Sequence, residues 1–80
     1  MEKSKRAANL KGYCINRLMT LEYLENNVQF QPMDKVRLKA KQNIIKHLLT
    51  YDNYAYFLNE EELAEYIDSR ADIICGFYED

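Results

Sequence analysis

The chain has 80 residues, a formal net charge of −2 at pH 7 and only two cysteines. This length suffices for one domain and not for two, and the core is thin because a domain of this size buries only about 60% of the surface of its unfolded chain. No apolar run approaches the ~18 residues of a membrane span and none follows the basic N-terminus as in a signal peptide, so we expect a cytoplasmic protein.

Few residues in the chain break helices. With two glycines and one proline, the composition favours long helices over strands and turns. We therefore expect an all-α fold in which residues 1–80 form a single helical domain. It would be a three-helix bundle, or a four-helix bundle if residues 54–58 add a short helix. Lys, Asn, Ile and Tyr, which AT-rich codons encode, are frequent, as is typical of a phage, plasmid or low-GC bacterial gene.

The first helix is expected over about residues 4–27, where apolar residues recur at helical spacing. Its predicted core stripe is Ala7, Leu10, Cys14, Leu18, Leu21, Leu24 and Val28. A second apolar row, here named the Gly12 row, lies opposite that stripe and consists of Ala8, Gly12, Ile15, Met19 and Tyr23. Glycine costs about 1 kcal/mol relative to alanine in a helix interior, and its small size would let another helix approach closely.

The second helix is expected over about residues 32–51, because Pro32 suits a first helical position and Asp34 complements the positive end of the helix dipole. Its predicted core stripe is Met33, Val36, Ala40, Ile44, Leu48 and Tyr51. A further apolar arc of Leu38, Ile45 and Leu49 predicts that this helix is covered on both sides. Its basic face consists of Lys35, Arg37, Lys39, Lys41 and Lys46. His47 falls on the core stripe, so we interpret it as a packed or capping residue rather than a general base.

The third helix is expected over about residues 60–75. Asn59 is a favourable N-cap with Glu62 three residues later, and Gly76 suits the position just past the helix. Its predicted core stripe is Leu63, Ile67, Ala71 (or Arg70) and Ile74. Two segments lie outside the helices: an aromatic connector at residues 51–58 and an aromatic, acidic tail at residues 77–80. The connector is one candidate cover for the Gly12 row, and a second chain is the other.

Charge is divided unevenly along the chain. Residues 1–47 carry ten basic and four acidic residues, and residues 48–80 carry one basic and nine acidic residues. Such asymmetry indicates a polar partner, or two halves that attract each other. Four carboxylates of the third helix form an acidic stripe opposite its core: Glu61, Glu65, Asp68 and Asp72. This stripe is either a solvated face or an acidic docking face.

Antiparallel packing of the second and third helices would bring the two charged faces together. It would pair Lys35 with Asp72, Lys39 with Asp68, and Lys46 with Glu61. The outward direction of the acidic stripe argues against these pairs within one chain, and the alternative is that they link two chains.

Cys14 and Cys75 lie far apart in the sequence, among apolar residues and in no metal-binding or redox spacing. We interpret them as buried free thiols in a reducing compartment, the alternative being a bridge between the two ends of the chain.

The sequence contains no calcium-loop pattern, no glycine-rich phosphate loop and no nucleophile with a recognisable base. We interpret Glu60, Glu61 and Glu62 as carboxylates that complement a helix dipole rather than as an acid–base or metal cluster. We therefore expect a protein that is not an enzyme, uses no cofactor or metal, and acts by binding another protein as a small regulator, adaptor or inhibitor.

The alternative function is nucleic-acid binding, with the basic N-terminus and the basic face contacting phosphates. A pI near 5.4 argues against it. We also expect the chain to form a homodimer through the Gly12 row, with Ala8 and Gly12 of one copy facing Met19 and Tyr23 of the other about a two-fold axis near Ile15.

Overall fold

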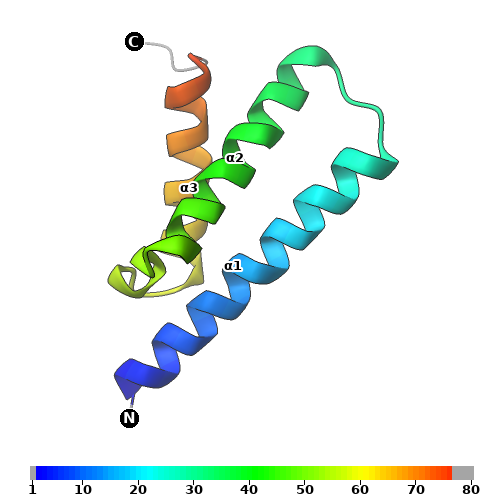
Figure 1. The fold of residues 1–80 in the computed structure, drawn as a ribbon. Helices are drawn as coiled ribbons and strands as arrows, with labels where there is room; N and C mark the ends of the chain where they lie inside the picture. The colour runs from blue at the N-terminus through cyan, green and yellow to red at the C-terminus, as the bar shows by residue number, and fades with distance from the viewer. Residues whose placement is uncertain (1, 77–80) are drawn as a thin grey trace.

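The computed structural model describes the backbone of residues 2–76 and the side chains of residues 5–76. Three α-helices and one 3₁₀ turn follow in the order α1 (Glu2–Asn27), α2 (Pro32–Thr50), η1 (Asn53–Tyr56) and α3 (Glu60–Cys75) (Figure 1). Within the described part of the chain there is no strand, so the predicted all-α bundle is confirmed. The predicted tail at residues 77–80 lies outside the described residues.

The local sequence explains where the helices begin and end. Pro32 opens α2, and the side chain of Asn59 caps α3 by accepting a hydrogen bond of 2.9 Å from the backbone N–H of Glu62. Glu62 reaches back and accepts from the N–H of Leu58 at 3.1 Å, which completes a variant of the predicted capping box. Gly76 follows α3 in the left-handed region, with φ of 74°, as predicted.

The turn between α2 and η1 depends on Asp52, which has φ of 56°. Aspartate tolerates this left-handed conformation better than bulkier residues, because its short carboxylate bonds locally. Here the carboxylate accepts a hydrogen bond of 3.1 Å from the hydroxyl of Tyr54. The chain thereby reverses after Tyr51 and places Tyr54 inward.

Helix α2 lies in the middle of the molecule, with α1 packed along one side and α3 along the other (Figure 1). Its buried positions face both neighbours, and η1 closes the end of the bundle against α1 and α2. The buried hydrophobic core consists of Leu10, Cys14, Leu21, Leu38, Ala40, Ile44, Ile45, Leu48, Tyr54, Leu63, Ile67 and Ala71. Two-sided cover of α2 was predicted from its surplus apolar arc, and the burial of Leu38 and Ile45 confirms it.

The predicted core stripe of α2 is wrong at both ends. Met33, Val36 and Tyr51 are 62%, 53% and 68% exposed. They lie in the first two turns of the helix and just past its end, so the buried arc is confined to the middle turns that α1 and α3 both cover. Three further residues that were predicted to face the core are also exposed. Val28 lies just past α1, Ile74 lies in the last turn of α3, and His47 lies on a side of α2 that no described helix covers.

Both cysteines are free, as expected, and no bridge joins them. Cys14 is fully buried, and Cys75 is partly buried with its Sγ 3.7 Å from the carbonyl oxygen of Val36. Burial raises the pKa of the Cys14 thiol to about 11, a rise that the nearby Arg17 reduces only in part.

Replacing Ile67 by alanine should lower the free energy of unfolding by about 2–5 kcal/mol, because this fully buried side chain leaves a cavity between α3 and α2. The matched control is Ile74→Ala on the same helix, where the side chain is 59% exposed and the expected loss is below about 1 kcal/mol. Urea unfolding followed by circular dichroism measures both. Equal losses would contradict the assignment of the core face of α3.

The buried thiol also predicts a loss of stability in alkali. Between about pH 9 and pH 11 the unfolded chain releases the Cys14 proton while the folded chain retains it, so the free energy of unfolding should fall as pH rises. Urea unfolding across this pH range should show that the free energy of unfolding falls less steeply for Cys14→Ala than for the wild type. Tyr54→Phe is the control. Burial also raises the pKa of Tyr54, so removing its hydroxyl should make the fall in the free energy of unfolding shallower while keeping the part that Cys14 causes. Identical slopes in the wild type and Cys14→Ala would refute the prediction.

Candidate protein-interaction surfaces

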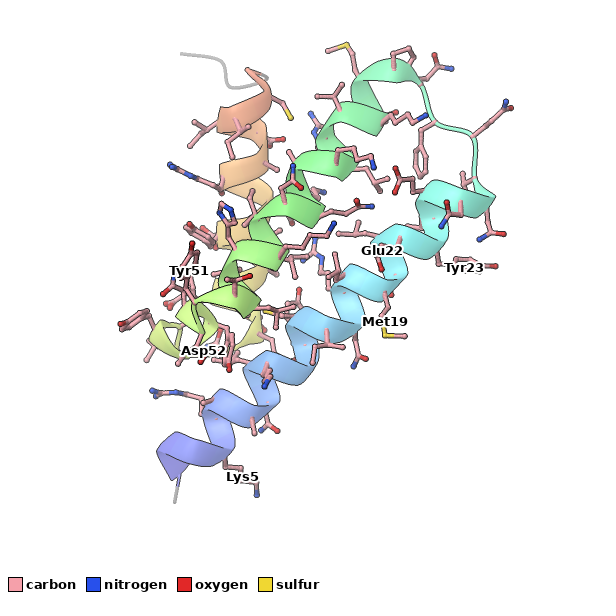
Figure 2. The ribbon with its side chains drawn as sticks, viewed as in Figure 1. Lys5, Met19, Glu22, Tyr23, Tyr51 and Asp52 are labelled. Carbon is pink, nitrogen blue, oxygen red and sulfur yellow. The ribbon has the colours of Figure 1, made fainter. Side chains whose placement is uncertain are left out.

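The Gly12 row lies on the side of α1 that faces away from α2. Ile15, Met19 and Tyr23 are 40%, 61% and 64% exposed, and Figure 2 shows Met19 and Tyr23 pointing outward. The aromatic connector does not cover them, because η1 packs on the inner side of α1 and buries Tyr54 in the core. Of the two covers considered for this row, the one within the chain is therefore excluded.

Gly12 occupies a position where its own chain does not require a glycine. A Cβ atom placed on Gly12 would meet nothing within 4 Å. Glycine destabilises the helix at this position, and no other described part of the same chain comes close enough to Gly12 to require it. Beside Gly12 the surface forms a hollow of about 610 Å³ between α1 and the first residue of α3, lined by Ala8, Asn16, Thr20 and Glu60 among others.

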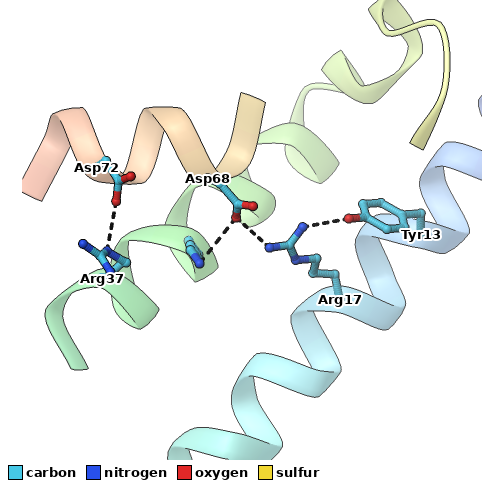
Figure 3. A network of polar contacts seen from close by, with 6 residues as sticks. Tyr13, Arg17, Arg37, Asp68 and Asp72 are labelled. Carbon is cyan, nitrogen blue, oxygen red and sulfur yellow. Dashed lines mark hydrogen bonds and ion pairs between the residues drawn. The ribbon is translucent and has the colours of Figure 1, made fainter. Parts of the chain in front are cut away.

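Two carboxylates of the predicted acidic stripe lie at the junction of the helices rather than opposite the core. Asp68 is 2.7 Å from Nη2 of Arg17 and 3.4 Å from Nζ of Lys41, and Asp72 is 2.9 Å from Nε of Arg37 (Figure 3). The opposing charges of the two halves of the chain therefore meet within one molecule. Of the four predicted docking carboxylates, Glu61 and Glu65 are exposed, whereas Asp68 and Asp72 are half-buried.

The predicted pairs of Lys35, Lys39 and Lys46 with Asp72, Asp68 and Glu61 are not formed within the chain. Helices α2 and α3 are antiparallel neighbours as supposed, but the flank of α2 that faces α3 bears Arg37 and Lys41. Helical periodicity located both flanks and did not show which of them turns toward α3.

Arg17 provides the contact from α1 to α3 in this network. Its guanidinium donates to the hydroxyl of Tyr13 at 2.7 Å and to Asp68, also at 2.7 Å. Partial burial alone would lower the pKa of Arg17, but these two partners outweigh it and raise the pKa, so the side chain stays charged. The network connects α1 to α3, which otherwise contact each other little.

The other flank of α2 pairs with α1. Lys39 is 2.6 Å from Oε2 of Glu25, and the buried Gln42 donates to Oε1 of the same carboxylate at 3.2 Å. Hydrogen bonds from Lys39 and then Gln42 hold the pKa of Glu25 below its ordinary value. Three of the five residues of the basic face, Arg37, Lys39 and Lys41, are thus engaged within the molecule.

A surface that the sequence did not reveal runs between α2, η1 and α3, and we name it the aromatic groove. It consists of two adjoining hollows of about 480 and 300 Å³ that share Leu48, Asn53 and Tyr66. Its walls and rim are formed by His47, Tyr51, Tyr56, Phe57, Tyr66 and Arg70. Buried Ile44 and Leu48 form its floor.

The tyrosines of the aromatic groove are open to solvent. Tyr51, Tyr56 and Tyr66 are 68%, 84% and 41% exposed. Ring contacts hold two of them in place: Tyr66 packs on Phe57 at 5.1 Å between centroids, and Tyr51 meets the edge of His47 at 6.1 Å. The aromatic density of residues 51–58 was the signal in the sequence, but Tyr51 was assigned to the core and Tyr66 to no surface.

Within residues 5–76 no three His, Cys, Asp or Glu side chains come together as ligands of a metal ion would. None of the described helices combines the length and the apolar character that crossing a membrane requires. No family model, no curated protein and no solved structure matches the chain.

Asp68 of α3 is the carboxylate that Arg17 of α1 and Lys41 of α2 share, so its removal should weaken the ion pairs between the three helices. Asp68→Asn should lower the free energy of unfolding by about 1 kcal/mol at low salt, because two cations lose a half-exposed partner, and by less at high salt. Glu65→Gln, an exposed carboxylate one turn earlier, is the control and should change stability by less than about 0.5 kcal/mol. Urea unfolding at two salt concentrations measures both. An equal, salt-independent effect of the two variants would rule out this role for Asp68.

Proposed function

We propose that this protein acts without catalysis, by binding a segment of another protein in the aromatic groove, as a small regulator, adaptor or inhibitor does. The observation that carries the proposal is the group of three exposed tyrosines around an apolar floor. Contiguous exposed apolar surface on a small domain typically marks an interaction site. Two free thiols suit action in a reducing compartment such as the cytoplasm.

The residue types of the groove support binding of a protein rather than simple solvation. Tyrosine and arginine are enriched among the residues that contribute most to binding energy at protein interfaces. Tyrosine provides a large contact area with few rotatable bonds, so ordering it on binding costs little entropy. Tyr66 and Arg70 stand on α3, and Tyr51 directly follows α2 with its ring against His47, so secondary structure and ring contacts already position these groups.

The charges at the rim indicate the chemistry of the bound segment. Arg70 is the only basic residue between residues 48 and 80, and it lies in the groove. No carboxylate lines either hollow of the groove. A segment with apolar side chains for the floor and an aspartate or glutamate beside them would complement this surface, and Asn53 offers an amide to its main chain.

The ion pairs of the basic face support this proposal over nucleic-acid binding. Phosphate contacts need lysine and arginine side chains that are free to leave their present partners, and Arg37, Lys39 and Lys41 are engaged in ion pairs. Of the basic face, only Lys35 and Lys46 remain outside these ion pairs, so the basic N-terminus would have to supply most of the phosphate contacts. We therefore propose no second function.

Selection of random peptides displayed on a surface tests the proposal directly. The wild type should enrich peptides that combine aromatic or aliphatic residues with an acidic residue. Arg70→Glu should enrich basic residues at the same place instead, because the charge at the rim is reversed. Tyr51→Ser combined with Tyr66→Ser should weaken binding of the enriched peptides by more than about tenfold, as loss of interface aromatic residues does.

The matched control is Met33→Ser, which changes an equally exposed apolar residue outside the groove. It should leave peptide binding unchanged. Failure to enrich any peptide, or equal binding by the double tyrosine variant with its circular dichroism spectrum intact, would reject the groove as the binding site.

A further inference from the structure

We infer that the Gly12 row binds a second copy of this chain, with two α1 helices packed antiparallel about a two-fold axis. The row lies on the outer side of α1, and the aromatic groove lies beyond α2. This inference therefore does not depend on the proposed function and leaves the groove of each copy open.

The row has small side chains at one end and large ones at the other, so it is complementary to an antiparallel copy of itself. A two-fold axis between Ile15 and Asn16 sets Gly12 against Met19 of the second copy and Ala8 against Tyr23. Each small residue then faces a large exposed one, and symmetry makes every such contact twice. The row therefore fits a reversed copy of itself.

Gly12 supplies an argument independent of that register. Its own chain leaves open space where a side chain would stand, so folding of the monomer gives no reason for glycine at this position. A helix of a second copy that approaches closely at Gly12 supplies the missing reason. The large side chain that would enter this space is Met19, which is 61% exposed in the single chain.

The charges beside the row are also complementary to a reversed copy. Lys11 and Glu22 are exposed and lie on the same flank of the row at 100° per residue. They are eleven residues apart, about 16 Å along the helix, so they cannot pair within one chain. Among the described residues neither has an ion pair.

The two-fold register brings these charges together between copies. With the axis between Ile15 and Asn16, Lys11 of one copy and Glu22 of the other lie on the same side of the interface. They are about 3 Å apart along the helix direction, within reach of a pair of long side chains. Two such ion pairs form, one at each end. A parallel arrangement about a two-fold axis would place these flanks of the two copies on opposite sides of the interface, so the pairs would not form.

Sedimentation equilibrium tests the inference on the full chain. The wild type should be a dimer at high micromolar concentration, with a dissociation constant that rises with salt. Lys11→Glu and Glu22→Lys should each raise the dissociation constant about three- to tenfold, and the double variant should restore the wild-type value. Rescue by the exchange of charges is expected if Lys11 and Glu22 pair between two antiparallel copies, and not if they only affect the stability of the monomer.

A second variant separates association from folding. Gly12→Leu should raise the dissociation constant by more than about tenfold, because two added side chains block the close approach. It should leave the free energy of unfolding of the monomer unchanged or higher, because leucine is the better helix former and open space surrounds this position.

Tyr51→Ser in the aromatic groove is the control and should dimerise like the wild type. A monomeric wild type, a Gly12→Leu variant that dimerises unchanged, or charge reversals that are not rescued by their combination would each overturn the inference. Peptide binding in the groove would remain measurable in all these cases, so the two proposals fail separately.

Discussion

Burial of α2 on two sides is the constraint from which the rest of the structure follows. The middle turns of this helix place Ile45 at full burial and Leu38, Ala40, Ile44 and Leu48 close to it. One helix thus provides apolar contacts for two neighbours, and a chain of this length obtains a continuous core without α1 and α3 packing closely together. It follows that α1 and α3 each retain a side without cover, and the two interaction surfaces arise beside those sides.

The ion pairs connect the helices where apolar packing between them is sparse or absent. Asp68 joins Arg17 of α1 to Lys41 of α2, and Arg37 holds Asp72 of α3. These contacts lie across the junctions between helices, where they fix how each helix is rotated about its own axis. The uneven distribution of charge along the sequence is therefore in part a property of the fold, with the basic helices surrounding one edge of the acidic one.

Sequence periodicity predicted the helices and their ends well, because those features depend on neighbours in the chain. Pro32, Asn59 and Gly76 act through local backbone geometry and were all identified. The rotation of α2 and α3 was not, because periodicity gives the angle between two flanks and not which neighbour each flank meets. Met33 and Tyr51 were misassigned for a related reason: a stripe continues to the helix end, whereas cover from other helices stops earlier. The aromatic groove combines residues from three segments, and only the folded chain brings Tyr51, Tyr56 and Tyr66 to one surface.

The position of η1 has a consequence for the motions of the folded chain. This turn contacts both α1 and α2, and its buried Tyr54 lies near Cys14, so residues far apart in sequence are held together at one end of the bundle. Leu10 and Cys14 in the first half of α1 are buried, and η1 packs against this helix, so this half would share the local stability of η1. Its backbone amides would exchange with solvent as one cooperative unit with the turn, while the second half of α1, held by Glu25 and Lys39, would open together with α2.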